Sequence, residues 1–304
     1  MSSEAYTHTI ERRRLRSAAL WGAVGVLGFS FTLPATRLAV AELDGTVVGL
    51  GRAVLAAVPA AALLWWTGER LPPLRLWPRL AVTALGVVVG FPLLSAWALT
   101  QLPAAHAAVI VGLLPAATAV MAALRAGERP SPGFWLASLL GLLAVLAFAA
   151  AAGAGRPQPA DGLVLLAVAL GGLGYAEGGA LARQLGGWQV ISWVLVLSAP
   201  FLLPVVAWRV HVTGLAAGPS AWLAVAYVSL ISMYAAFFAW YRALAEGGVA
   251  QMGQLQLAQP VLTMLWSVLL LGEPVSAAMA LAAAAVLASV ALTQRARVTQ
   301  SPRD

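Results

Sequence analysis

The chain has 304 residues, of which 61% are hydrophobic and only 10% are charged. Soluble globular proteins carry roughly 25% charged residues, so this chain has too few charges to cover a water-exposed surface. Its net charge of +7 comes from 18 Arg with no Lys, scattered between apolar runs; this excludes a nucleic-acid-binding face. The absence of Cys excludes disulfides and Cys metal sites. The three His share no metal-ligand spacing, so we expect neither a metal nor a cofactor.

Apolar segments of about 20 residues, the length needed to cross a bilayer, follow one another along the chain. The first begins after the Arg-rich stretch 12–16 and is too long for the core of a cleavable signal peptide. The predicted membrane helices are 18–38, 46–66, 79–99, 104–123, 133–152, 162–182, 189–208, 221–241, 249–271 and 275–293. The sequence therefore predicts an all-α integral membrane protein with ten transmembrane helices.

The distribution of Arg predicts the orientation, because cytoplasmic loops retain positive charge. With the N-terminus inside, 14 of the 18 Arg fall on the inner side. The outer side holds only Arg37, Arg52, Arg156 and Arg209. Both termini are therefore predicted to be cytoplasmic, which requires an even number of membrane helices.

The two halves of the chain repeat one another. The matching features are the stretches 28–37 and 174–183, Trp97 and Trp240, Pro115 and Pro260, and the pairs Gly127-Glu128 and Gly272-Glu273. Their offsets stay near 143–146 residues, so the matches are collinear.

Five helices per copy is an odd number, so the second copy must enter the membrane from the opposite side. The sequence thus predicts two inverted five-helix repeats, 18–155 and 156–294. A cytoplasmic segment 1–17 precedes them and a cytoplasmic tail 295–304 follows. Inverted repeats of this kind place a substrate site near mid-membrane, between the halves.

A Pro in the fourth helix of each half, with Gly-Glu before the fifth, resembles the EamA-type transporters of the drug/metabolite transporter superfamily. Arg52 is similar to the Arg commonly found near the start of their second helix, although its second-half counterpart is apolar. The resemblance covers essentially the whole chain. It implies a ten-helix carrier of the inner (plasma) membrane, often an exporter of amino acids, metabolites or toxic organic compounds. Within this sequence, Arg52 is expected to be structural and to contact Glu42 or Asp44.

Glu177 lies in the middle of the sixth predicted helix, where an ionised carboxylate costs at least about 2.5–3.5 kcal/mol. Its counterpart in the first half is Phe31, so the repeat is asymmetric there. Such a group could couple transport to protons or contact the substrate. Pairing with an Arg, or exposure to a wet vestibule, is the alternative.

Side-chain amides form a second candidate face. On an ideal helix Gln251, Gln254 and Gln259 fall within a sector of about 140°. Lining a substrate cavity and joining helices by hydrogen bonds are equally open for this face. His106 is a polar group in the matching helix of the first half and is a further cavity candidate.

Four aromatic residues could also line a cavity: Tyr175, Trp97, Trp240 and Tyr234. Trp97 and Trp240 occupy equivalent positions in the two halves. Most other Trp lie near helix ends, which is typical of interfacial belts.

The remaining candidates act on the backbone. Pro115 and Pro260 each remove a donor within a helix and could form a hinge or a static kink. Glu128 and Glu273 precede the fifth and tenth predicted helices, where a carboxylate favours the positive helix end. Both Glu are interpreted as structural.

The sequence favours a secondary transporter, and an exporter in particular, that moves small organic metabolites by alternating access. Amino acids and amphipathic or aromatic compounds are the candidate substrates. A phosphate-binding loop needs Lys, so the chain does not use ATP directly. Its three Asp lie outside the predicted helices, and without paired acids or an activated nucleophile we expect no catalytic residues and no enzyme.

The alternatives are a lipid flippase and a non-transporting membrane partner protein. The expected partners are a small-molecule substrate, protons as a candidate coupling ion, and membrane lipid, with no nucleic acid. Substrate identity and oligomeric state stay open.

Overall fold

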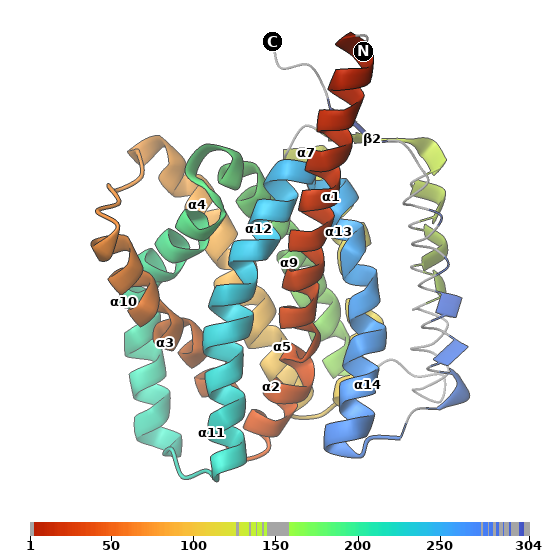
Figure 1. Cartoon of the computed structure of the whole chain (residues 1–304). Helices are drawn as coiled ribbons and strands as arrows, with labels where there is room; N and C mark the ends of the chain where they lie inside the picture. The colour runs from red at the N-terminus through yellow and green to blue at the C-terminus, as the bar shows by residue number, and fades with distance from the viewer. Residues whose placement is uncertain are drawn as a thin grey trace.

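The computed structural model describes residues 3–125, 128–133 and 158–274, scattered positions between 135 and 144 and between 276 and 292, and residues 298–300 (Figure 1). Eight helical segments in this part of the chain are long and apolar enough to cross a membrane. They are Arg13–Val40, Gly45–Trp66, Leu74–Leu99, Ala104–Arg125, Pro159–Leu185, Gly187–Thr213, Pro219–Gly247 and Val249–Leu271. The all-helical membrane architecture is confirmed. The predicted helices 133–152 and 275–293 lie largely outside the described residues, so ten helices remain a prediction.

Most of these segments are built from shorter elements. The helices are α1 (Ser3–Ser30), α2 (Thr32–Val40), α3 (Gly45–Trp66), η1 (Leu74–Leu76), α4 (Trp77–Thr83), η2 (Ala84–Gly90), α5 (Phe91–Leu99), α6 (Ala104–Val111), α7 (Leu114–Arg125), α9 (Pro159–Leu185), α10 (Gly187–Thr213), α11 (Pro219–Ala226), η3 (Tyr227–Ala235), α12 (Ala236–Gly247), α13 (Val249–Gly253), η4 (Gln254–Ala258) and α14 (Gln259–Leu271). Two short strands, β1 (Glu128–Pro130) and β2 (Val298–Gln300), pair antiparallel.

Local sequence signals set the connections between these helices. Asp44 caps α3, because its side chain accepts hydrogen bonds from the amides of Thr46 and Val47 at 2.9 and 3.1 Å. Single glycines make two sharp reversals: Gly186 (φ 95°) joins α9 to α10, and Gly248 (φ 88°) joins α12 to α13. These backbone conformations favour glycine because it has no Cβ.

The two halves depart from α-helical geometry at matching places. η2 and η3 are π-helical turns whose first residues, 84 and 227, are 143 positions apart, the offset that also relates Trp97 and Trp240. Such turns are rare and are frequently found at functional sites. The structure thus adds a second level of repetition to the sequence matches.

The segments that carry the matching prolines of the two repeats are also interrupted. Pro115 is the second residue of α7, which follows the break after α6. Pro260 is the second residue of α14, which follows the 3₁₀ turn η4. Each proline therefore begins a new helical piece, where its missing amide costs little.

Glycines allow close helix packing around the centre. α1 lies along α12 (Figure 1), and Gly25 meets the backbone of Trp240, which a Cβ would approach to 3.2 Å. α9 crosses η2 at Gly174 and Gly86, where a Cβ on Gly86 would lie 2.6 Å from the Gly174 Cα. Small residues at such crossings are typical of membrane helices.

The start of the described chain and the segment near its end lie at the same end of the bundle. Figure 1 shows β2 beside the N-terminal part of α1. β2 pairs with β1, which directly follows α7. The C-terminal end of α12 packs against the middle of α1, where Gly247 meets Ala18.

Candidate functional site

A cavity lies at the centre of the bundle, where elements of both sequence repeats meet. Its polar lining residues are Thr32, Arg52, Tyr175, Ser232 and Gln259. Its volume is about 20 Å³, enough for a water molecule but not for an organic solute. The helices must separate before the cavity can hold a metabolite.

Arg52 is the charged residue of this cavity. It is 3% exposed, and its Nε and Nη1 atoms are buried without a hydrogen-bond partner. An Arg within the membrane costs at least about 2.5–3.5 kcal/mol, and an unpaired one gains no Coulomb energy in return. Residues of this kind usually mark functional sites.

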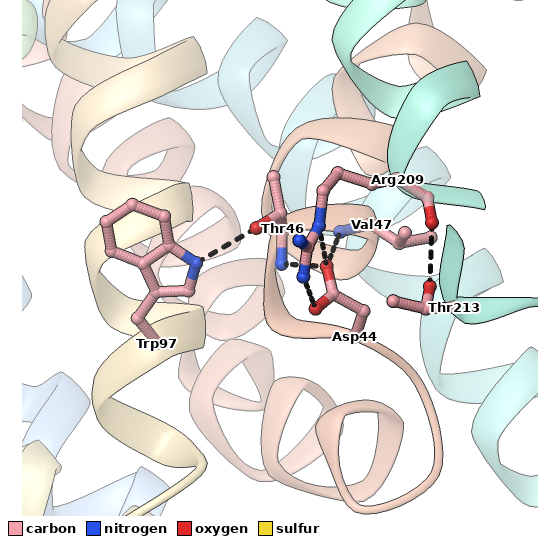
Figure 2. A network of polar contacts seen from close by, with 6 residues as sticks. All are labelled: Asp44, Thr46, Val47, Trp97, Arg209 and Thr213. Atoms are coloured by element: carbon pink, nitrogen blue, oxygen red, sulfur yellow. Dashed lines mark hydrogen bonds and ion pairs between the residues drawn. The ribbon is translucent and has the colours of Figure 1, made fainter. Parts of the chain in front are cut away.

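The expected contact of Arg52 with Asp44 is wrong, because Arg209 occupies that carboxylate. Arg209 Nη2 lies 2.5 Å from Asp44 Oδ2, and its Nε lies 3.3 Å from Oδ1 (Figure 2). The expected contact with Glu42 is wrong too, since Glu42 accepts a hydrogen bond from the amide of Gly218. Arg52 sits two turns into α3 and is directed to the cavity instead.

Asp44 belongs to a separate polar network at the start of α3. Burial alone would raise the pKa of Asp44. The hydrogen bonds from Arg209 and from the amides of Val47 and Thr46, together with the positive charge of Arg209, outweigh this effect and lower the pKa below the usual 3.8. Trp97 joins the same network by donating from Nε1 to Thr46 Oγ1 at 3.1 Å (Figure 2). Trp97 is 39% exposed there, so it does not line the cavity.

Four aromatic rings form one wall beside the cavity. Phe29 and Phe237 meet edge to face with centroids 5.0 Å apart, and Tyr175 lies 5.6 Å from Trp240. Trp240 is fully buried, and its indole nitrogen has no hydrogen-bond partner. Tyr234 lies outside this wall, where it packs on Phe238 and hydrogen-bonds Ser192 at 3.0 Å.

The amides of η4 and its neighbours are arranged differently from the ideal-helix expectation. Gln259 lines the cavity, and its Oε1 is buried without a partner. Gln254 is buried at 3% exposure, but Gln251 is exposed. Gln256, outside the predicted face, is 2% exposed, with neither amide atom hydrogen-bonded. The 3₁₀ turn explains the difference, because it advances the chain by about 120° per residue rather than 100°.

Glu177 does not line the cavity but joins three helices near one end of the bundle. Its Oε2 lies 2.9 Å from Nε of Arg125, and its Oε1 pairs with Nε of Arg79. The carboxylate is 1% exposed, whereas the two Arg side chains are 43% and 30% exposed. This is the Arg-paired alternative for Glu177.

His106 and Glu273 connect the two halves at the starts of α9 and α6. His106 Nε2 lies 2.9 Å from Asp161 Oδ1 in the first turn of α9. Glu273 accepts hydrogen bonds from the amides of Ala104 and Ala105 at 3.0 and 2.9 Å, at the start of α6. A carboxylate at this position satisfies free helix amides and favours the positive helix end.

Comparison with known proteins fits this arrangement. The EamA-like transporter family matches residues 16–150 and again 158–295. The chain belongs to the EamA-like transporter family. It is a multi-pass membrane transporter of the drug/metabolite transporter superfamily and not an enzyme. The two matched regions divide this EamA transporter where the predicted repeats divide, and the cavity has lining residues from both.

Individual relatives cover nearly the whole of this EamA chain. It is 47% identical over 274 residues to "Uncharacterized transporter YdeK" of Bacillus subtilis, covering 90% of this chain and 96% of that one. It is 26% identical over 248 residues to a "Probable terminal-alkyne amino-acid exporter" of Streptantibioticus cattleyicolor, covering 81% and 83%. A crystal structure at 23% identity, with a TM-score of 0.69 and coverage of 91% and 98%, shows the same fold.

Several cavity residues of this EamA transporter are not among the sequence candidates. Thr32 and Ser232, from opposite halves, share a hydrogen bond of 2.7 Å between their hydroxyl oxygens. Phe29 completes the aromatic wall. Phe29 and Thr32 lie in the repeated stretch 28–37, which is a signal that could have identified them.

Proposed function

We propose that this EamA transporter is a secondary carrier that exports small organic metabolites, amino acids or amphipathic and aromatic compounds, by alternating access. The single observation that carries the proposal is the narrow central cavity lined from both halves, with a buried Arg and an aromatic wall. A cavity too small for a solute fits an occluded state between inward-open and outward-open states. The exporter relative named for amino acids supports that solute class.

The proposed topology is ten helices in two inverted five-helix halves of the inner (plasma) membrane, with both termini cytoplasmic. Paired π-helical turns and paired proline breaks support the two halves. Fourteen Arg on one predicted side support the orientation. The shared location of β2 and the start of α1 supports an even number of crossings.

Transport by the purified full-length chain tests the function. Liposomes carrying the protein are loaded with an excess of unlabelled solute and diluted into a trace of the labelled form. A carrier accumulates the label transiently by exchange, so we expect saturable uptake for at least one amino acid or aromatic acid. Trp65→Ala is the matched control, since Trp65 is 87% exposed and away from the cavity; it should transport normally.

The same liposomes separate the alternatives. A flippase would move labelled lipid between leaflets without exchanging any solute. A non-transporting partner protein would do neither. Either result would contradict the proposal.

A further inference from the structure

We propose that Arg52 and Gln259 hold the two charged ends of an α-amino acid, Arg52 its carboxylate and Gln259 its ammonium group. The proposal rests on the proposed transport function and narrows its substrate class. Arg52 places a positive charge in a buried space, and two of its donor nitrogens have no acceptor.

None of the acidic side chains that the structure describes pairs with Arg52. Every acidic side chain that the structure describes is engaged elsewhere: Glu42 with Gly218, Asp44 with Arg209, Glu69 with Gln189, Asp161 with His106, Glu177 with Arg79 and Arg125, Glu246 with Arg242, and Glu273 with the start of α6. The stretches 131–160 and 274–303 contain no Asp or Glu at all. We therefore assign the counter-charge of Arg52 to the solute.

A carboxylate matches this demand better than a larger anion. The planar guanidinium offers parallel donors to the two oxygens of a carboxylate. Thr32, Ser232 and Tyr175 carry the hydroxyl groups of the cavity, and those of Thr32 and Ser232 bond to one another. A phosphate dianion would need more donors than this arrangement leaves free.

Gln259 supplies the complementary group. Its Oε1 is a buried acceptor without a donor, and it lines the same cavity as Arg52. An ammonium group adjacent to the carboxylate would satisfy it, and aromatic faces also attract cations. The rings of Phe29, Tyr175 and Phe237 then leave an apolar wall for the rest of the solute. The unpaired guanidinium nitrogens of Arg52 and the unpaired amide oxygen of Gln259, in one cavity, match the two charged ends of a zwitterion.

Matched solutes test this assignment. The probes are the neutral amino acids, each compared with the amine lacking its carboxylate and the acid lacking its amino group; for phenylalanine these are phenethylamine and 3-phenylpropionate. Binding to the purified protein is followed by tryptophan fluorescence, and exchange is followed in liposomes. We expect at least one amino acid to bind, and its amine to bind at least about 30-fold more weakly, the loss expected for a buried charge pair.

Variants connect this selectivity to the residues. Arg52→Gln should weaken amino-acid binding by about 30-fold or more, and Arg52→Lys should restore part of it. Gln259→Leu should reduce by about tenfold the ratio of the affinity for the amino acid to the affinity for the acid that lacks the amino group. Arg209→Gln is the matched control outside the cavity and should leave affinity unchanged.

Stability separates a binding role from a structural one. Because Arg52 is unpaired, Arg52→Gln should raise the unfolding temperature of the solute-free protein, by roughly 2–4 °C or more. If Arg52 had a structural role instead, Arg52→Gln would lower the unfolding temperature.

If an amine binds as tightly as its amino acid in the native protein, if Arg52→Gln binds the amino acid normally, or if no probe binds, the assignment is wrong. If the protein exchanges organic cations but no amino acid, the assignment of Arg52 and Gln259 is wrong, although the protein is still a transporter. If it exchanges no solute, both the assignment and the proposed transport function are wrong.

Discussion

At the scale of single residues, charge is distributed unevenly through this transporter. The described carboxylates have hydrogen-bond donors or Arg partners, but Arg52 has no described acceptor for two of its nitrogens. Buried charges are stable when they are paired and hydrogen-bonded. Arg52 is therefore where we propose that the solute binds, whereas the paired carboxylates connect parts of the bundle.

Glu177 is the first residue at which this distinction can be measured. Glu177→Gln removes the negative charge that pairs with both Arg79 and Arg125. Because these two Arg side chains are partly exposed, we expect the protein to lose about 1–3 kcal/mol of stability. Thermal unfolding followed by tryptophan fluorescence measures the loss. The pH dependence of solute exchange should not change in this variant. Loss of pH-driven exchange with native stability would instead make Glu177 the coupling group.

Asp44 gives a pH-dependent prediction. Its pKa is lowered in the folded protein, so its ion pair with Arg209 stabilises the protein above the unfolded value of 3.8 and is lost as pH falls through the lower folded pKa. Asp44→Asn keeps a helix-capping side chain but removes the ion pair with Arg209, so it should lower the stability of the folded protein at neutral pH.

The unfolding temperatures of the native and Asp44→Asn proteins, compared from pH 3 to pH 8, measure this contribution. We expect a constant difference at neutral pH that shrinks below about pH 4. A difference that grows on acidification would contradict the assigned pairing.

At the scale of elements, the helix limits could be predicted from the sequence but the helix faces could not. The approximate limits of a membrane helix follow from the total hydrophobicity of about 20 consecutive residues. One polar residue within such a segment changes this total little. Faces depend on the winding of each turn, so η4 turns Gln256 inward and leaves Gln251 exposed. The partners of Glu177 and the lack of a partner for Arg52 arise from tertiary contacts, which no local pattern contains.

The crossing of α9 and η2 is the element contact most sensitive to side-chain size. A Cβ on Gly174 would lie 2.6 Å from Val87 Cγ1 and 3.1 Å from the Gly86 Cα. Gly174→Leu should therefore force the helices apart and cost at least about 1–3 kcal/mol of stability. Gly162→Leu, on the same helix with nothing within 4 Å of the new Cβ, is the control. Equal unfolding temperatures for the two variants would show that this crossing is not tightly packed.

At the scale of the whole molecule, the repeat detected in the sequence reappears as paired helix irregularities around one cavity. π-helical turns and proline breaks interrupt the backbone on both sides of that cavity. Interruptions of this kind occur where helices bend or line a site. The described helices are thus interrupted in both halves, which fits the alternating access that we propose.

Thiol labelling of the cavity from each side of the membrane tests the central claim most directly. The native chain has no Cys, so Ser232→Cys places a single thiol in the cavity and Trp65→Cys places one on the exposed surface. A membrane-impermeant thiol reagent is added to vesicles of either orientation, with and without the transported solute. Alternating access predicts that Cys at 232 reacts from both sides and that the solute slows both reactions. Reaction from one side only, or from neither, would contradict a pathway through this cavity.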